Sequence, residues 1–320
     1  MNEGLHLSPN QRAWRRFRRN RAASLALVVL LGVIALILVW PLFNAPALAP
    51  VLPKAITHNP DATSDAQFAP PGWAHWFGTD VHGRDLLSRV CYGARVSLLV
   101  GVVGAAVSLV IGVLWGAIAG YCGGRWDGVM MRFVDVLYSM PSVVFVIVLI
   151  TALNAMLGKL QSGPHGLSSS TARLLQFAGL FAGLGAVSWL TMARIVRGQV
   201  LSLRPRAFVD ASRVLGASHA RILLRHILPN VYGVIIVYLT LTIPSIILYE
   251  SFLSYLGLGI QPPQASLGSL IASGAEQINP IRIYWWLIVF PAAALALTLL
   301  ALNFVGDGLR DAWDLRSARN

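Results

Sequence analysis

The sequence predicts an all-α integral membrane protein with six transmembrane helices. Of its 320 residues, 56% are hydrophobic and only 12% are charged. Several apolar runs also reach the roughly 20 residues that a helix needs to cross the hydrocarbon core of a bilayer. A soluble domain of this length could bury a core, but it would not leave such long stretches without a charge. Composition and run length together therefore favour a membrane protein over a soluble one.

The first predicted span, 22–43, follows an arginine-rich N-terminal segment, 1–21. The motif PALA at 46–49 resembles a signal-peptide cleavage site, but the apolar run before it is longer than a typical signal-peptide core. This favours an uncleaved first helix, followed by an extracytoplasmic segment at 44–94. Five further runs have spanning length: 96–121, 134–157, 174–192, 231–255 and 283–305.

The basic residues predict the orientation. With the N-terminus in the cytoplasm, 18 of the 25 lysines and arginines fall in cytoplasmic segments. Membrane proteins concentrate Lys and Arg on that side, so both termini, including the tail 308–320, are expected to be cytoplasmic. The net charge of +12 is thus explained by topology, and it does not indicate nucleic-acid binding.

Small residues recur every four positions in the second span, at Ser108, Gly112, Gly116 and Gly120. Four-residue spacing places them on one helix face, where another helix backbone can approach closely. The second span is therefore expected to lie inside a helix bundle.

Charged residues cluster just before the second span. Arg84, Arg89 and Arg95 lie near Asp80 and Asp85, so some of these charges are expected to be paired. A local structural role is favoured over direct substrate contact, because charged residues are mostly surface residues. Two histidines lie in the same segment, but without a His pair at i, i+4 or a cysteine they do not indicate a metal site.

A polar, basic stretch, DASRVLGASHARILLRHILPN, occupies 210–230 between the fourth and fifth spans. A short helix is expected over 206–215, with a break at Gly216 and a second helix that begins at Ser218 and ends at Pro229. The stretch could be a linker that lies on anionic headgroups. The glycine break and the many helix-forming residues favour a docking element for a cytoplasmic partner.

The same stretch is similar to the cytoplasmic signature of the inner-membrane subunits of ABC importers: Glu-Ala-Ala, three residues, Gly, nine residues, Ile, one residue, Leu-Pro. The matching residues are Asp210, Ala211, Gly216, Leu228 and Pro229. The departures are Asp210 in place of Glu, Ser212 in place of the second Ala, and His226 in the Ile position. Asp keeps the charge of Glu, and Ser keeps the small size of Ala.

The resemblance extends over roughly residues 77–314. The segments GTDVHGRDLLSRVCYGARVSLLVG, SWLTMARIVRGQVLSL, RHILPNV, ESFLSYLGLG and NFVGDGLRDAWD resemble the C-type permease subunit of bacterial oligopeptide and dipeptide transporters. The oligopeptide branch is favoured, while import of dipeptides, nickel or glutathione remains an alternative. The resemblance implies a type I ABC importer permease fold, with a transmembrane core at 95–307 that includes a coupling loop at 193–230.

The resemblance also implies partners and roles. The chain would lie in the bacterial inner membrane with a second, homologous permease subunit, two ABC ATPase subunits and an extracytoplasmic peptide-binding protein. ATP and Mg²⁺ would be used by the ATPases, and this chain would bind no cofactor or metal. The residues expected to couple the chain to the ATPases are Asp210, Ala211, Ser212, Arg213, Gly216, Leu228 and Pro229.

What the sequence lacks agrees with a non-catalytic role. A Walker A loop needs Gly-Lys followed by Ser or Thr, but the only lysines are Lys54 and Lys159, and neither has this context. There is also no HExxH or GxSxG motif of a hydrolase. A secondary transporter would show two inverted halves with corresponding broken helices, and no such repeat is evident.

Three residues are candidates for the substrate path. Pro141 and Pro244 fall inside the third and fifth predicted spans, where each removes a backbone hydrogen bond and can kink the helix. For both prolines, a role in shaping the path and a purely structural role are left open. Glu250 is an acid within a span, which indicates a cavity or a partner. A structural pair with an arginine of a partner subunit is favoured over contact with a peptide amino terminus.

Overall fold

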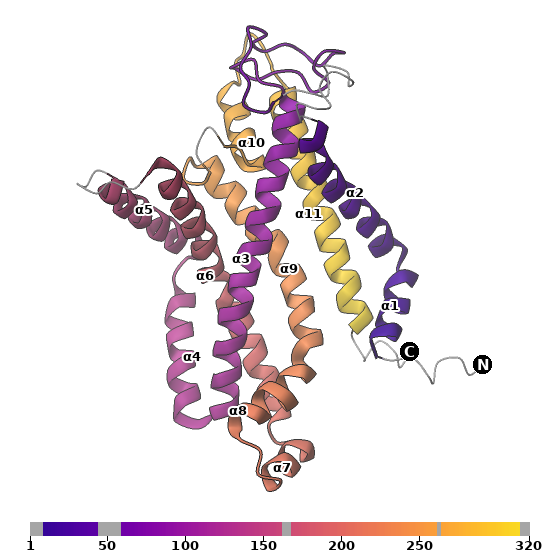
Figure 1. Ribbon diagram of the computed structural model, residues 1–320, viewed down its shortest axis with the longest axis vertical. Helices are drawn as coiled ribbons and strands as arrows, with labels where there is room; N and C mark the ends of the chain where they lie inside the picture. The colour runs from indigo at the N-terminus through magenta and orange to yellow at the C-terminus, as the bar shows by residue number, and fades with distance from the viewer. Residues whose placement is uncertain (1–8, 44–58, 162–167, 261–263, 314–320) are drawn as a thin grey trace. The chain divides into compact units, whose positions relative to one another are not determined.

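The structure is a computed structural model that describes residues 9–43, 59–161, 168–260 and 264–313 (Figure 1). Within these ranges the chain is helical and contains no β-strand, only an isolated bridge between Thr79 and Asp85. The elements, in chain order, are α1 (Pro9–Arg19), α2 (Arg21–Phe43), α3 (Leu86–Cys122), α4 (Gly124–Ser139), α5 (Ser142–Gln161), α6 (Ser169–Leu203), α7 (Ala207–Val214), α8 (His219–Arg221), the π-helix η1 (Ile222–Ile227), α9 (Leu228–Tyr255), α10 (Leu267–Glu276) and α11 (Trp286–Trp313).

Five helices within the described residues are long and apolar enough to cross a membrane. They are Arg21–Pro41, Leu86–Cys122, Ser142–Leu160, His219–Tyr255 and Trp286–Trp313. The predicted all-helical membrane fold is therefore confirmed. The predicted count of six is matched only approximately, because the span expected at 174–192 lies in α6, which is not among these five.

The third predicted span, 134–157, is wrong as a single helix. Ser139 ends α4, and Met140 adopts an extended conformation with φ −82° and ψ 140°. The ring of Pro141 disfavours the helical conformation for the residue before it, so the chain breaks there and α5 begins at Ser142. Pro141 thus separates two helices instead of kinking one. Pro244 does lie inside a continuous helix, α9.

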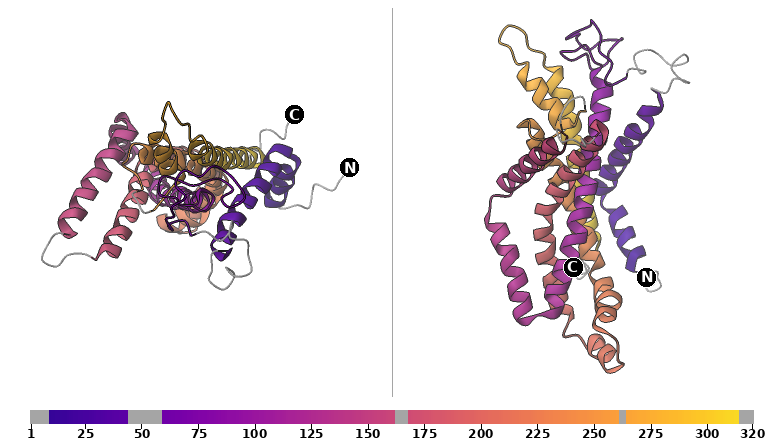
Figure 2. Two further views of the ribbon diagram at one scale, coloured as in Figure 1. Left: turned by 90° about the horizontal axis from the view of Figure 1, so that it is seen from above. Right: turned by 60° about the vertical axis from the view of Figure 1, so that its left-hand side comes forward.

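The chain forms two compact units, whose boundaries fall between α1 and α2 and inside α3, α9 and α11. Unit 1 comprises Met1–Asn20, Val102–Ile246 and Gly306–Asn320, and unit 2 comprises Arg21–Gly101 and Ile247–Val305. In unit 1, α5 lies alongside α6, a pairing that the left panel of Figure 2 shows from above.

Unit 1 contains a close approach between α3 and α6. A Cβ added to Gly112 would lie 2.6 Å from a methionine side chain of α6, and one on Gly120 would lie 2.9 Å from the carbonyl oxygen of Arg197. A Cβ on Gly116 would collide with the carbonyl oxygen of Ala193. Three of the four small residues thus face the α6 backbone, while Ser108, one turn earlier, is fully buried.

An ion pair joins α4 to α6 near this contact. The Nε and Nη2 atoms of Arg197 donate to the two carboxylate oxygens of Asp127 at 2.5 and 2.6 Å. These hydrogen bonds raise the pKa of Arg197, which lies beyond the apolar stretch 174–192, so the guanidinium keeps its charge. A second pair, Arg194 with Asp135 at 2.9 Å, is more exposed.

Unit 2 encloses its own hydrophobic core. Its buried members are Ile37, Leu86, Val90, Ala94, Ala265, Leu267, Leu270, Trp286 and Leu287. The segment before α3 is attached to this core because the indole N–H of Trp286 donates to the carbonyl of Thr79 at 3.3 Å. The carboxylate of Asp85 then caps α3, accepting from the Ser88 N–H at 2.9 Å and bonding the Nδ1 atom of His75 at 3.0 Å.

Candidate functional site

The connection between α6 and α9, residues 204–227, is the candidate site of unit 1. It contains α7, α8 and η1, and Figure 1 and the right panel of Figure 2 show α7 beyond the ends of α3 and α4. Most of its residues are exposed, including Asp210, Ala211, Arg213 and Gly216. A polar helix at the end of the unit is thus available for contact with another protein.

The break at Gly216 is confirmed, and its cause is local. Gly216 has a φ of +76°, a conformation that costs other residues energy because of their Cβ atom. Its N–H bonds the carbonyl of Arg213 at 2.9 Å, and the N–H of Ala217 bonds the carbonyl of Ser212 at 3.0 Å. These two bonds form a Schellman motif, which satisfies the last carbonyls of α7 and ends the helix.

The next helix begins as predicted but does not end as predicted. The Ser218 side chain accepts a hydrogen bond from the Arg221 N–H, which caps α8. The expected helix end at Pro229 is wrong, because α8, η1 and α9 run on without a break. In η1 the Leu228 N–H bonds the carbonyl of Leu223, five residues back. This wider turn gives the proline ring more room beside the preceding carbonyls than an α-helix would.

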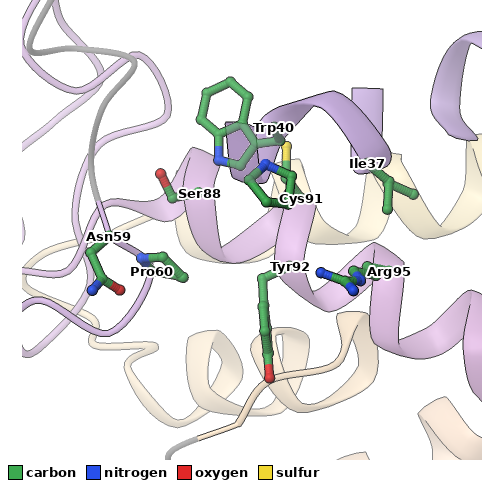
Figure 3. A pocket seen from close by; sticks show the side chains of 9 residues that line it. Ile37, Trp40, Asn59, Pro60, Ser88, Cys91, Tyr92 and Arg95 are labelled. Atoms are coloured by element: carbon green, nitrogen blue, oxygen red, sulfur yellow. The ribbon is translucent and has the colours of Figure 1, made fainter. Parts of the chain in front are cut away.

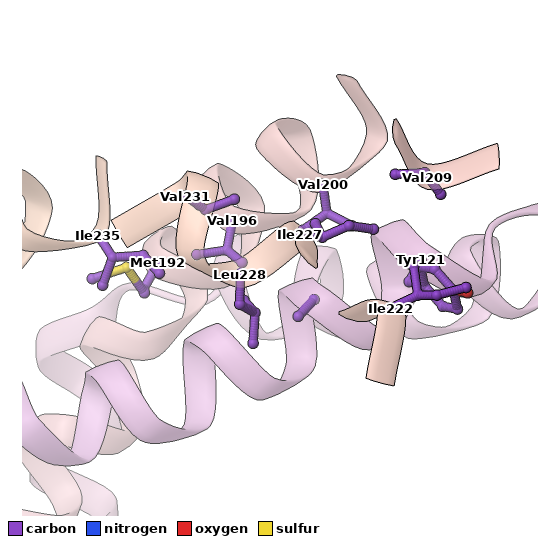
Figure 4. Packing of buried hydrophobic residues seen from close by; sticks show 11 residues of the cluster. Tyr121, Met192, Val196, Val200, Val209, Ile222, Ile227, Leu228, Val231 and Ile235 are labelled. Carbon is purple, nitrogen blue, oxygen red and sulfur yellow. The ribbon is translucent and has the colours of Figure 1, made fainter. Parts of the chain in front are cut away.

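One buried side chain anchors α7 to the rest of unit 1. Val209 is fully buried in a hydrophobic cluster that Figure 4 shows extending from Met192 and Ile235 at one end to Val209 at the other. The connection is also tied to the end of α3, since the Tyr121 hydroxyl lies 2.9 Å from Nδ1 of His219. Displacement of α7 would therefore act directly on α3, α6 and α9 within unit 1.

The structure brings most, but not all, of the predicted coupling residues together. Asp210, Ala211, Ser212 and Arg213 lie on α7, and Arg213 pairs with Asp210 at 2.9 Å. Leu228 and Pro229 lie in the first turn of α9 instead, where Leu228 is buried in the cluster of Figure 4 and Pro229 is exposed.

Sequence reasoning missed two residues of this surface. Val214 and Leu215, at the end of α7, expose 87% and 86% of their area. These two adjacent apolar side chains are therefore available for contact with another protein. The available signal was an apolar pair directly before the helix-ending glycine in a polar stretch.

Glu250 occupies a different environment, in the interior of unit 2. Its side chain is fully buried. Ser254 donates to one carboxyl oxygen at 2.6 Å, and Ser97 donates to the other at 3.1 Å. The Ser97 hydroxyl also accepts the Leu267 N–H at 3.2 Å, so the network joins α3, α9 and α10. The carboxyl group is thus enclosed by residues of its own unit. Pro141 and Pro244, the other two path candidates, belong to unit 1.

Two cavities are lined by described residues of unit 2. The smaller one, of about 290 Å³, is shown in Figure 3, with Asn59 and Pro60 on one side and Arg95 on the other. The larger one, of about 500 Å³, is lined by the start of α3, the end of α9 and α10. Among the described residues, no group of three or more His, Cys, Asp and Glu side chains is placed to hold a metal ion.

Two family models match this chain. The model of the inner membrane component of binding-protein-dependent transport systems matches residues 112–319, and the model of the N-terminal transmembrane domain of oligopeptide transport permease C matches residues 8–71. The oligopeptide transport system permease protein OppC of Escherichia coli (strain K12) is 46% identical over 304 residues, covering 95% of this chain and 90% of the relative. The dipeptide transport system permease protein DppC of Bacillus subtilis (strain 168) is 40% identical over 313 residues, covering 98% and 88%.

A solved structure shares the fold. An inward-facing conformation of the MetNI methionine ABC transporter aligns with a TM-score of 0.54 at 18% identity, covering 71% of this chain and 97% of that chain. Sequence identity over nearly the whole chain, together with the family models, leads to one conclusion. The chain belongs to the family of inner membrane components of binding-protein-dependent transport systems, as a member of its oligopeptide permease C branch.

Proposed function

We propose that this chain is a membrane-spanning permease subunit of an ATP-driven ABC importer of oligopeptides. The observation that carries the proposal is the 46% identity to an oligopeptide permease subunit over 95% of the chain. Import of dipeptides is the second candidate, favoured by the 40% identity to a dipeptide permease subunit. In this proposal both termini lie in the cytoplasm, as the N-terminal segment 1–21 and the tail 308–320. The segment 44–94 lies outside the cell membrane.

The importer would contain four further subunits. A second, homologous permease would share the translocation path formed by the core 95–307, two ATPases would hydrolyse ATP with Mg²⁺, and a peptide-binding protein would deliver the substrate from outside. This chain contributes no catalytic group and no cofactor. Its lack of a Walker A sequence supports the assignment of hydrolysis to other chains.

The coupling loop 193–230 would connect ATP hydrolysis to transport through α7. The helix offers an exposed surface with an ion pair, Arg213 with Asp210, beside the exposed apolar pair Val214 and Leu215. An ATPase bound to this surface would move α7, and Val209 would transmit the movement to the hydrophobic cluster of unit 1. The expected residues Asp210, Ala211, Ser212, Arg213 and Gly216 lie on α7 or at its end.

The test is reconstitution of the complete importer in liposomes, with uptake of labelled tri-alanine and binding of the ATPases as the two measurements. Leu215→Ser should weaken ATPase binding about tenfold or more, because burial of one leucine side chain contributes about 1.5–3 kcal/mol. The matched control is Leu224→Ser, which changes an apolar residue of the same connection that is 59% exposed but lies on η1.

Three outcomes would contradict the proposal at different levels. If the wild-type complex hydrolyses ATP but imports neither tripeptides nor dipeptides, the chain is not a peptide permease. If import is normal and Leu215→Ser binds the ATPases as tightly as the wild type does, α7 is not the coupling surface. If Leu215→Ser and Leu224→Ser weaken ATPase binding equally, the ATPase contact extends over the whole connection between α6 and α9. In that case α7 has no special role in coupling.

A further inference from the structure

The larger cavity of unit 2 combines small-molecule size with a polar wall. Its volume of about 500 Å³ lies within the roughly 300–1,000 Å³ that is usual for ligand pockets. Its lining includes Arg89 at the start of α3, Tyr255 at the end of α9, and the residues Gln264 and Gln277. These groups belong to a single unit, so their arrangement is defined by the fold of that unit alone.

Arg89 is buried in the wall of this cavity without adequate partners. The residue is 6% exposed, and neither Nε nor Nη1 has a hydrogen-bond partner among the residues that the structure describes. The nearest carboxylate oxygen in an ion pair, on Asp80, lies 3.7 Å from Nε, which is too far for a hydrogen bond. Buried guanidinium N–H groups without acceptors are costly, because they lose their hydration and gain nothing in return.

Asp80 cannot fully compensate Arg89, because other donors occupy its oxygens. One oxygen accepts the N–H of His82 at 2.8 Å and the N–H of Arg84 at 3.0 Å. The other accepts Nε of Arg84 at 2.7 Å. Arg84 therefore takes the carboxylate as its hydrogen-bond partner, and Arg89 keeps only the long ion pair with Asp80. Glu276 lines the cavity as well, but no ion pair joins it to an arginine within the described part of the chain.

We propose that this cavity is a carboxylate-binding subsite, in which Arg89 binds the C-terminal carboxylate of the transported peptide. This inference rests on the proposed function. A carboxylate would supply the hydrogen-bond acceptors that Nε and Nη1 of Arg89 lack, and charge-assisted bonds from guanidinium to carboxylate are among the strong hydrogen bonds of proteins. Every unmodified peptide carries this group whatever its side chains. One arginine therefore recognises the class without selecting a sequence, while the nearby amides offer contacts to the peptide backbone.

The test compares two peptides in two arginine variants. The complete importer in liposomes is supplied with tri-alanine or with its C-terminal amide, and kcat/KM for uptake is measured for wild type, Arg89→Gln and Arg95→Gln. Arg95 is the matched control because it lies on the same helix but is exposed and does not line this cavity. The binding protein is the same in every arm, so its own preference for a free carboxylate cancels when the ratios are compared.

The expected result is a loss of discrimination in one variant only. The ratio of acid to amide uptake should fall about tenfold or more in Arg89→Gln and stay at the wild-type value in Arg95→Gln. An unchanged ratio in Arg89→Gln with normal uptake overturns the subsite alone. Equal loss of both peptides also overturns it, and would assign Arg89 to the fold or to an acidic group of a partner protein. Absence of any peptide uptake by wild type overturns the proposed function itself, and the subsite with it.

A second measurement needs no variant. A tripeptide with a photoreactive benzoylphenylalanine at its C-terminal position is crosslinked to the working wild-type complex, as the free acid and as the amide. The free acid should label the cavity wall, at 255–257 or 269–277, and the amide should label it about tenfold less. Ongoing uptake without labelling of these segments, or equal labelling by both forms, overturns the subsite even if Arg89→Gln fails to assemble.

Discussion

Replacing Gly116 by alanine should destabilise unit 1 by an amount that the contact between α3 and α6 sets. The added methyl group would collide with the carbonyl oxygen of Ala193 and would lie 3.0 Å from both the carbonyl carbon of Ala193 and the nitrogen of Arg197. All three are backbone atoms of a helix, so no side-chain rotation relieves the contact. The two helices must move apart, and other close contacts along the same face are then lost.

The magnitude follows from two opposing effects. Overpacking a close contact costs about 1–3 kcal/mol, and a clash with helix backbone belongs at the upper end, about 3 kcal/mol. Alanine also favours the helix over glycine by about 1 kcal/mol, which leaves a net loss of about 2 kcal/mol. At about 2 °C per kcal/mol for a chain of this size, the unfolding midpoint should fall about 4 °C.

The control is Gly128→Ala in α4, where an added Cβ meets no atom within 4 Å. It receives the same gain in helix propensity without the clash, so its midpoint should rise by about 2 °C. Thermal unfolding of the purified chain in one detergent, followed by tryptophan fluorescence, measures both variants. Equal midpoints for Gly116→Ala and Gly128→Ala would refute the close approach of α3 to α6.

Three further predictions concern other contacts. Gly216→Ala should reduce peptide uptake more than Gly216→Asn, because the positive φ costs alanine about 1–2 kcal/mol whereas asparagine tolerates it better. Equal uptake by the two variants would show that the Schellman turn is not needed for coupling. Arg197→Lys should lower the free energy of unfolding by about 1–3 kcal/mol, and Arg194→Lys by less than about 1 kcal/mol, because the pair of Arg197 with Asp127 is bidentate and more buried. Denaturant unfolding in mixed micelles measures both losses, and a larger loss in Arg194→Lys would contradict this reasoning. Ser254→Ala removes a donor from the buried Glu250 and should cost about 1–3 kcal/mol in the same assay, so a neutral result would contradict the network.

Features with a local physical cause were predictable from the sequence. Gly216 ends α7 because its conformation suits glycine, and Ser218 begins the next helix because its hydroxyl accepts from the first turn. The glycines of α3 were predictable for a related reason, since their four-residue spacing places them on one face whatever lies opposite. The membrane class followed from composition and the length of the apolar runs, and the comparisons confirm the family that the short motifs indicated.

Features that depend on tertiary packing were not predictable. Pro141 follows the break between α4 and α5, whereas Pro229 lies within the continuous helical run from α8 to α9, directly after the π-helical turn. The exposure of Val214 and Leu215 depends on which face of α7 Val209 buries, which a short, weakly amphipathic pattern does not define. Glu250 has serine partners on α9 and α3, and Ser97 is far away in the sequence, so spacing alone could not identify it.

The π-helical turn also determines the rotational phase between the α6–α9 connection and α9. A π-helix holds one residue more per turn than an α-helix would, so η1 amounts to a single inserted residue. Each residue of an α-helix turns the chain by about 100°. Deleting one residue from 222–227 would restore an ordinary helix and rotate α7 by about that angle about the α9 axis, carrying Val209 out of its hydrophobic cluster. The number of residues in this segment is therefore constrained by the packing of Val209.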